Sequence, residues 1–216
     1  KKEPDFNLRI FFSGSIVDEG YGFFKWDKDP TKFPNRIKII NTLLKEFKNE
    51  IFLIKTKKDL KSSDISKKKI IFCLHDKMIK KTSYTLNFKE NFNLLKSSCF
   101  NLSCPGVVMP LCHHLIEGIK VGSIPITNCE KLLFPNLDKD ISLHYSSLDQ
   151  LIIKMQEALV MKSDEIIFKR EKVLNYYKSH LSPESFRLNF LNMLSQKERE
   201  IICCDDHRSV DRFIAN

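Results

Sequence analysis

The sequence lacks several features that would place it at once in a common class of protein. No apolar run approaches the length that a helix needs to cross a bilayer, so we expect no transmembrane segment. There is no Cys-X-X-Cys pair, and the seven cysteines follow no disulfide-framework spacing, which favours a reducing compartment. Neighbouring Cys112, His113 and His114 cannot all face one ion from a helix, so we expect no bound metal.

What is present is typical of a globular protein. A chain of 216 residues that is 42% hydrophobic and 29% charged can bury a substantial core, as one large or two small domains. The first residues, from Lys1 to Asp5, contain neither an initiator methionine nor the apolar core of a signal peptide. We therefore expect a cytoplasmic protein, with peripheral attachment at the inner membrane surface left open, and a chain that is part of a longer one.

The net charge of +9 raises the question of a nucleic-acid partner. Much of this excess lies in the lysine-rich stretch 55–69, which separates two apolar runs and is expected to be a solvated connection. No zinc-finger spacing, aromatic RNA-binding strand or basic recognition helix accompanies it. We therefore expect no specific nucleic-acid binding, although a basic surface also suits phosphorylated small molecules and anionic membranes.

Apolar segments of two kinds alternate along the chain. Strands are predicted over residues 8–12, 51–54, 70–74, 99–102, 123–126 and 141–145, and helices over residues 36–48, 87–97 (or a turn), 111–121, 147–160, 165–179 and 181–195. Asn35 and Asp164 are expected to cap the helices that follow them. Such alternation predicts an α/β fold with a Rossmann-like, doubly wound, mainly parallel sheet. Residues 1–195 would form this domain, followed by a helix or tail over residues 196–216.

The segment from Cys99 to Thr127 carries most of the functional information. It predicts a strand, a turn broken by Pro105 and Gly106, a helix whose first turn includes Pro110, and a second strand. In this helix an apolar arc of Leu111, Cys112, Leu115, Ile116 and Ile119 would pack on the sheet. Open α/β sheets bind ligands at such strand-to-helix turns.

Two polar residues of this helix are the leading functional pair. His113 and Glu117 are four residues apart, so they lie on the same side of the helix and clear of its apolar arc. There they can reach a ligand that lies over the turn. The alternative is that both are solvated residues on an outer face.

The stretch SCPGVVMPLCHHLIEGIKVGSIPI, together with Phe134-Pro135 and the later NYYKSHLSPESF, resembles the donor-binding C-terminal half of GT-B glycosyltransferases, most closely the exostosin-like branch. The resemblance implies a metal-independent enzyme that moves a sugar from a nucleotide-sugar to a polysaccharide, glycan or glycolipid, in cell-surface glycan synthesis. It implies no tightly bound cofactor. It also implies an N-terminal acceptor domain or partner, and a catalytic base that can lie outside this chain.

The resemblance also implies a set of donor-binding residues. The turn from Ser103 to Gly106 would hold the diphosphate, His113 and His114 would meet the donor, and Glu117 would bind the ribose hydroxyls. Gly14 and Ser15 correspond to the first glycine turn of the domain, and Arg36 to a basic residue that begins the next helix. His75, which ends a strand at the expected ligand edge, is a further candidate. The full set is Gly14, Ser15, Arg36, His75, Ser103, Cys104, Pro105, Gly106, His113, His114 and Glu117.

A second interpretation remains open. A Rossmann-like module that binds a nucleotide or a partner protein without turning anything over would show the same fold pattern and would need no catalytic base. The presence of another α/β domain upstream would favour the transferase over this module.

Overall fold

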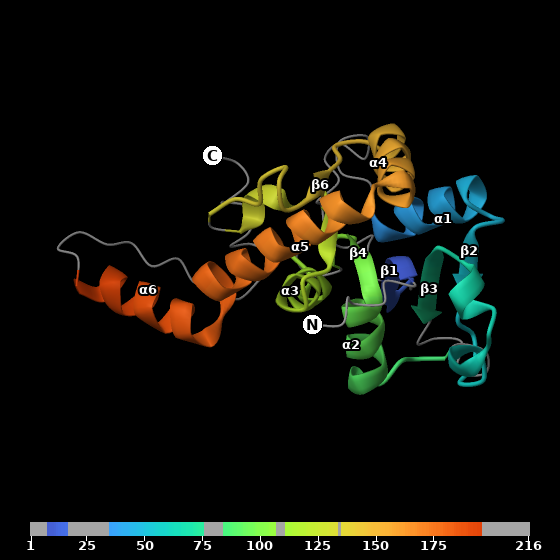
Figure 1. Ribbon diagram of the computed structural model, residues 1–216, viewed down its shortest axis with the longest axis horizontal. Helices are drawn as coiled ribbons and strands as arrows, with labels where there is room; N and C mark the ends of the chain where they lie inside the picture. The colour runs from blue at the N-terminus through green and yellow to red at the C-terminus, as the bar shows by residue number, and fades with distance from the viewer. Residues whose placement is uncertain (1–7, 17–34, 76–83, 107–110, 134, 196–216) are drawn as a thin grey trace.

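The computed structural model describes residues 8–16, 35–75, 84–106, 111–133 and 135–195. Its centre is a six-stranded sheet in the order β2-β3-β1-β4-β5-β6, and all the strand pairs are parallel (Figure 1). The strands are β1 (Leu8–Ser15), β2 (Ile51–Leu53), β3 (Ile70–His75), β4 (Ser98–Ser103), β5 (Ile124–Thr127) and β6 (Leu143–His144). The predicted Rossmann-like α/β fold is confirmed.

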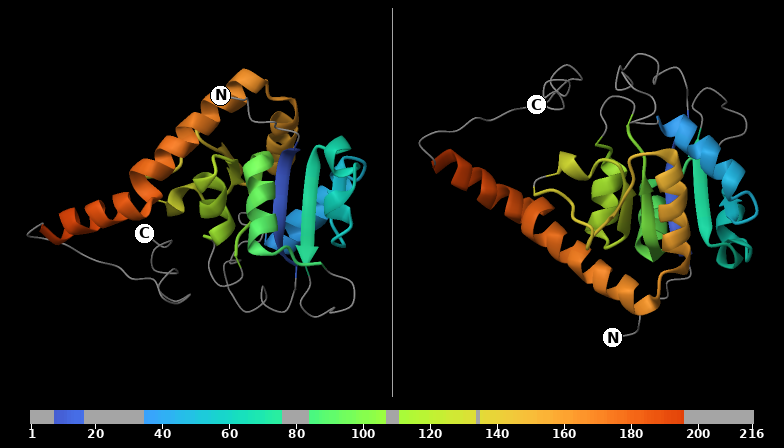
Figure 2. Two further views of the ribbon diagram at one scale, coloured as in Figure 1. Left: turned by 60° about the horizontal axis from the view of Figure 1, so that its bottom comes forward. Right: turned by 90° about the horizontal axis from the view of Figure 1, so that it is seen from above.

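Helices cover both faces of this sheet (Figure 2). They are α1 (Arg36–Glu46), α2 (Phe88–Ser97), α3 (His113–Lys120), α4 (Leu148–Val160), α5 (Ser163–Tyr176) and α6 (Pro183–Ser195), with a π-helical turn η6 (Tyr177–Leu181) between the last two. Helix α1 packs beside α4, and α2 packs beside α3. Phe11 and Asn101, which are paired in register, point towards α2 and α3, so these two helices share one face and α1 and α4 cover the other.

The strands are apolar on both sides because both faces of the sheet are covered. In β1, Ile10 and Phe12 pack towards the core that includes Ile40 of α1, whereas Phe11 packs with Leu95 of α2 on the opposite face. This explains why the sequence of β1 is apolar at successive positions. A strand with one exposed face would instead alternate apolar and polar residues.

Local capping explains where several helices begin. The side chain of Asn35 accepts a hydrogen bond from the backbone nitrogen of Lys38, as the sequence predicts. Asn87 and Glu90 form a complete capping box at the start of α2. The expected cap at Asp164 is wrong, because α5 begins at Ser163 and Asp164 lies inside its first turn. There its carboxylate still faces the positive end of the helix dipole.

The lysine-rich stretch is more ordered than a plain loop. It contains two short 3-10 helices, η3 (Asp59–Lys61) and η4 (Ile65–Lys67), and links β2 to β3 without an intervening α-helix. In the sheet β3 lies between β2 and β1, whereas the usual order for a doubly wound sheet has the second strand next to the first.

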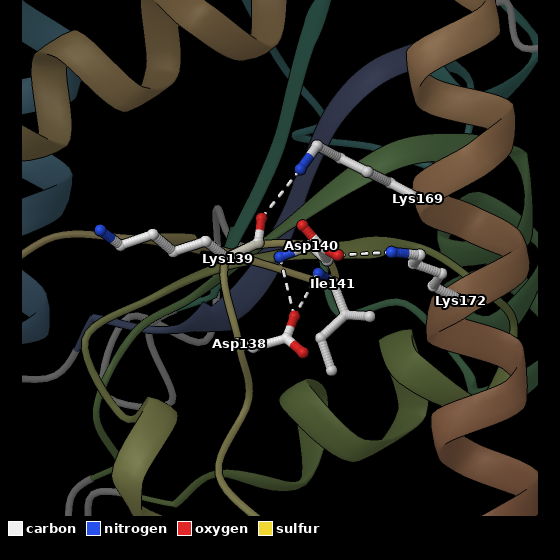
Figure 3. A network of polar contacts seen from close by, with 6 residues as sticks. All are labelled: Asp138, Lys139, Asp140, Ile141, Lys169 and Lys172. Carbon is white, nitrogen blue, oxygen red and sulfur yellow. Dashed lines mark hydrogen bonds and ion pairs between the residues drawn. The ribbon is translucent and has the colours of Figure 1, made fainter.

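Helix α5 crosses the molecule and is tied to the turn that precedes β6 (Figure 3). Lys169 donates to the carbonyl oxygen of Lys139 at 2.8 Å, and Lys172 forms an ion pair with Asp140. Asp138 orders this turn by accepting from the backbone nitrogens of Asp140 and Ile141, at 2.8 and 3.1 Å.

Helix α6 then projects away from the sheet (Figure 1). Within the described ranges, no helix has the length and apolar character to span a membrane.

Candidate functional site

The strand order places the topological switch point of the sheet between β1 and β4. The chain leaves β1 for α1 on one face and leaves the neighbouring β4 for α3 on the other face. Ligands of open α/β sheets bind outside the carboxyl ends of the strands at this point. Most of the predicted site residues lie on the segments that meet here.

At the end of β1, three predicted residues come together. The Arg36 guanidinium folds back from the first turn of α1, donates to the carbonyl oxygen of Ser15 at 3.3 Å and lies 5.9 Å from the ring centroid of Phe12. A Cβ on Gly14 would come within 2.8 Å of the Phe12 ring and 3.3 Å of the guanidinium. Because Gly14 has no side chain, the permanently charged guanidinium of Arg36 can lie against the end of β1.

His75 lies beside this group at the end of β3. It pairs in register with Ser15, and its carbonyl oxygen accepts from the backbone nitrogen of Ile16 at 3.2 Å. Its half-buried side chain belongs to the same carboxyl edge of the sheet. The structure thus brings four of the predicted residues together on the β3–β1 side.

On the other side of the switch point, β4 ends in buried groups. The Ser103 side chain is 2% exposed, and its hydroxyl oxygen lies 3.9 Å from the Cys112 sulfur. Cys104 is completely buried, and this burial raises the pKa of its thiol far above the usual value. A neutral, enclosed thiol cannot contact a ligand over the turn, so only the backbone of Cys104 remains available there. Pro105 and Gly106 are half-buried, and residues 107–110 lie outside the described part of the chain.

The helix after this turn begins later than the sequence predicts. It starts at His113 with Cys112 as its N-cap, so Leu111 precedes it, and the expected place of Pro110 in its first turn falls outside the described residues. Its buried arc consists of His114, Leu115, Gly118 and Ile119, with Ile116 only half-buried. The predicted arc packs on the core, with Leu111 and Ile116 half-buried, and the structure extends this arc to His114 and Gly118 because Gly118 lets β4 approach the helix closely.

His114 is consequently a core residue and does not face a ligand on the open edge. It is 4% exposed and packs between the rings of Phe11 and Phe12, with centroid distances of 5.8 and 5.9 Å. Burial, together with the positive charges of His113 and Arg36, lowers its pKa to about 3. Among the described residues neither ring nitrogen has a hydrogen-bond partner. A neutral imidazole enclosed in this way offers no charge to a phosphate.

His113 and Glu117 occupy the side of α3 that the sequence predicts for them. His113 is exposed, and the half-buried Glu117 accepts a hydrogen bond from the side-chain amide of Asn91 at 3.3 Å. Asn91 lies in the first turns of α2, and α2 follows β3, so this contact is near the carboxyl edge of the sheet. The carboxylate of Glu117 is therefore held near the switch point by a neighbouring helix.

Two residues that sequence reasoning missed organise this side of the site. Asn91 fixes Glu117, and Asn101, fully buried in β4, lies against α3 and donates to the carbonyl oxygen of His114 at a long 3.4 Å. Nothing in the local sequence marks Asn91. Asn101 did carry a signal, because it is a polar side chain inside an otherwise apolar strand.

Three cysteines and one tyrosine lie close together near the turn. Cys104, Cys112, Cys129 and Tyr145 are all buried, and burial raises the pKa of Cys129 to about 12 and that of Tyr145 well above its usual value. No cluster of three or more His, Cys, Asp or Glu side chains in the described ranges has the geometry to hold a metal ion.

Comparison with known proteins adds little beyond the fold. No family model matches the chain, and no curated protein matches its sequence. Among solved structures, the N-terminal domain of the trehalose-6-phosphate phosphatase of Candida albicans superposes with a TM-score of 0.47 and 12% sequence identity. The match covers 88% of this chain and 42% of that one, so this chain spans less than half of that structure. Strand order and pairing establish a Rossmann-like α/β domain with its topological switch point between β1 and β4.

Proposed function

We propose that this domain binds a nucleotide-sugar at the carboxyl edge between β1 and β4, as the donor-binding half of a GT-B glycosyltransferase of the exostosin-like branch. One observation carries the proposal: the Arg36 guanidinium is held on the end of β1, at the switch point where β4 leads into α3. The sequence resemblance independently assigns the diphosphate to the Ser103–Gly106 turn and the ribose to Glu117.

The charges at this edge suit a nucleoside diphosphate. A guanidinium presents paired donors to phosphate oxygens, and the backbone amides at the beginning of α3 add partial positive charge. On the next turn of α3, Glu117 can accept hydrogen bonds from two ribose hydroxyls. Because Asn91 already donates to one of its oxygens, the carboxylate is oriented before the donor arrives.

In the proposed reaction, an acceptor hydroxyl displaces the nucleoside diphosphate from the anomeric carbon of the sugar. The bond from that carbon to the diphosphate oxygen breaks, and the electron pair leaves with the diphosphate. Arg36 and the α3 amides stabilise the charge that develops on this leaving group. The acceptor is a polysaccharide, glycan or lipid-linked glycan, and the departing proton of its hydroxyl needs a base.

Two buried titratable groups at this edge cannot act as that base. His114 has its pKa lowered to about 3 and is enclosed, and burial keeps the Cys104 thiol neutral. As the resemblance implies, we assign the base to an N-terminal domain that carries the acceptor. The same observation favours a second candidate function, a module that binds a nucleotide or a partner protein without turnover.

Calorimetric titration with UDP-, GDP- and CMP-sugars tests the donor site. We expect one of them to bind, and Arg36→Met to weaken that binding by about 10- to 100-fold because a charged hydrogen bond is lost. Glu117→Gln should weaken it by about 10-fold. Lys45→Met, at the far end of the same helix α1, is the matched charge control and should bind normally. No binding by any of the three donors, or equal effects of Arg36→Met and Lys45→Met, would refute the site.

Turnover separates the two candidates once binding is established. The protein with its upstream region is mixed with the preferred donor and an oligosaccharide acceptor, and release of the free nucleoside diphosphate is followed. Acceptor-dependent release supports the transferase, whereas binding without release supports the non-catalytic module.

A further inference from the structure

The stretch 55–69 concentrates the positive charge of the chain. It contains seven lysines and two aspartates, which leaves a net +5 of the total +9, and it contains no arginine. Charge alone does not distinguish a solvated loop from a binding surface. The structure adds which side chains face inward and what lies beside them.

The acidic and apolar side chains of this stretch are used to order it. One carboxylate oxygen of Asp59 accepts from the backbone nitrogens of Lys55 and Thr56, both at 2.8 Å. Leu60 and Ile65 pack against the core cluster on the α2 face of the sheet. Lys55, Lys57 and Lys58 are left exposed at the carboxyl end of β2. The segment is thus a shaped surface with its lysines on the outside.

The first turn of α2 continues this surface. Tyr84 packs against the same core cluster as Leu60 and Ile65, and its hydroxyl donates to Glu90 of α2 at 2.7 Å. Phe88, the first residue of α2, is 72% exposed. Its ring stacks on that of Phe92 at a centroid distance of 5.8 Å, and Lys89 beside it is exposed.

We define the lysine face as Lys55, Lys57, Lys58, Phe88 and Lys89. We propose that the lysine face binds the surface of a membrane that contains anionic phospholipids. Lysine ammonium groups at the end of long stems attract anionic headgroups from several angles, at about 1 kcal/mol each near the surface. The exposed Phe88 ring supplies the apolar group that enters the headgroup region.

The composition of the lysine face favours lipid over nucleic acid. The forked guanidinium of arginine is the side chain best suited to paired contacts with bases and phosphates, and this face has no arginine. Because the face lies at the carboxyl end of β2 and the start of α2, membrane contact would turn the ligand edge of the sheet towards the lipid. The inference does not depend on nucleotide-sugar binding at that edge.

Co-sedimentation of the full chain with vesicles tests this surface. We expect binding to vesicles of phosphatidylcholine mixed with phosphatidylserine, weak binding to phosphatidylcholine alone, and loss of binding as salt is added. Lys55→Gln, Lys57→Gln and Lys58→Gln together should lower the partition coefficient on the order of 100-fold. Phe88→Gln should lower it about 10-fold.

Matched controls make the test specific to this face. Lys48→Gln, Lys120→Gln and Lys162→Gln together remove the same charge from exposed lysines that follow α1, end α3 and follow α4, at the opposite end of the sheet. Phe168→Gln removes another exposed phenylalanine, on α5. These controls should keep vesicle binding. Equal losses in both triple variants, no binding to anionic vesicles, or binding of random duplex DNA in their place would overturn the proposal.

Discussion

The side chain of Asn101 occupies the space that a Cβ on Gly118 would fill. Such a Cβ would lie 2.5 Å from three side-chain atoms of Asn101, a separation that real Cβ atoms essentially never show. Asn101 is fully buried in β4, so it cannot move aside into solvent. This contact sets how closely α3 approaches the sheet.

Gly118→Ala should therefore destabilise the protein. Helix propensity alone would favour alanine by about 1 kcal/mol. Overpacking against a buried side chain, however, destabilises a protein by about 1 to 3 kcal/mol. We expect a net loss of up to about 2 kcal/mol in the free energy of unfolding, measured with urea. The double variant Asn101→Ala with Gly118→Ala should be less affected than the two single losses added together. Strict additivity of the two losses would show that the residues do not meet.

The left-handed backbone at Gly122 ends α3 and makes a second prediction. Its φ of +76° is one that L side chains rarely adopt, and a Cβ there would come within 2.9 Å of Leu174 on α5. We expect Gly122→Ala to cost about 2 kcal/mol, which lowers the melting temperature by roughly 4 to 8 °C in a chain of this size. Gly122→Asn should be milder, because asparagine tolerates this conformation. An unchanged melting temperature in the alanine variant would contradict the assigned backbone.

Arg170 stabilises the ends of two helices at once. Its guanidinium donates to the carbonyl oxygen of Ser98, and also to those of Lys96 and Val121 at 3.5 and 3.3 Å, near the ends of α2 and α3. Burial lowers its pKa to about 10, so it keeps its charge at neutral pH. Arg170→Met should lower the free energy of unfolding by about 3 kcal/mol, because it removes the donor from one buried and two partly buried carbonyl groups.

Two controls accompany the Arg170 variant. Arg187→Met removes an exposed arginine of α6 and should change the free energy of unfolding little. Arg170→Lys should recover only part of the loss, because a single ammonium cannot reach both helix ends as the fork does. Full recovery by lysine would mean that charge alone is responsible.

The enclosed imidazole of His114 predicts a pH dependence of stability. Its pKa is lowered from 6.5 to about 3 on folding, so between these values the unfolded chain binds a proton that the folded protein does not. The contribution of the neutral His114 imidazole to the free energy of unfolding is complete above about pH 6.5, and it is lost as the pH falls towards 3. Denaturant titration should show a loss of about 2 kcal/mol between pH 7 and pH 5.

His114→Phe is the companion variant for this measurement. It removes the titrating ring and retains an aromatic side chain beside Phe11 and Phe12. The loss of stability between pH 7 and pH 5 should shrink by about 2 kcal/mol, and stability at pH 7 should rise by about 1 kcal/mol as a buried polar group without a protein partner disappears. An unchanged pH profile in the variant would mean that His114 is accessible to protons in the folded state.

The sequence by itself was sufficient for the local structure and the class of fold. The Asn35 cap, the buried strands such as β3 and the glycine end of α3 at Gly122 depend on neighbours in the chain, and all were predicted. Alternation of strands and helices then led to a parallel sheet, because parallel strands need crossover connections. Of the candidate site, the side of α3 that carries His113 and Glu117 followed from helical periodicity alone.

Only the tertiary structure decided the features that depend on contacts between distant segments. The place of β3 between β2 and β1, the folding of Arg36 onto the end of β1 and the enclosure of His114 are of this kind. Helical periodicity predicts which residues share a face of a helix. How deeply that face is buried depends on the side chains of the segment that packs against it. For α3 the burial is set by Gly118 on the helix, which lies opposite Asn101 on β4. Neither segment specifies this contact by itself, because it requires both residues to be brought together.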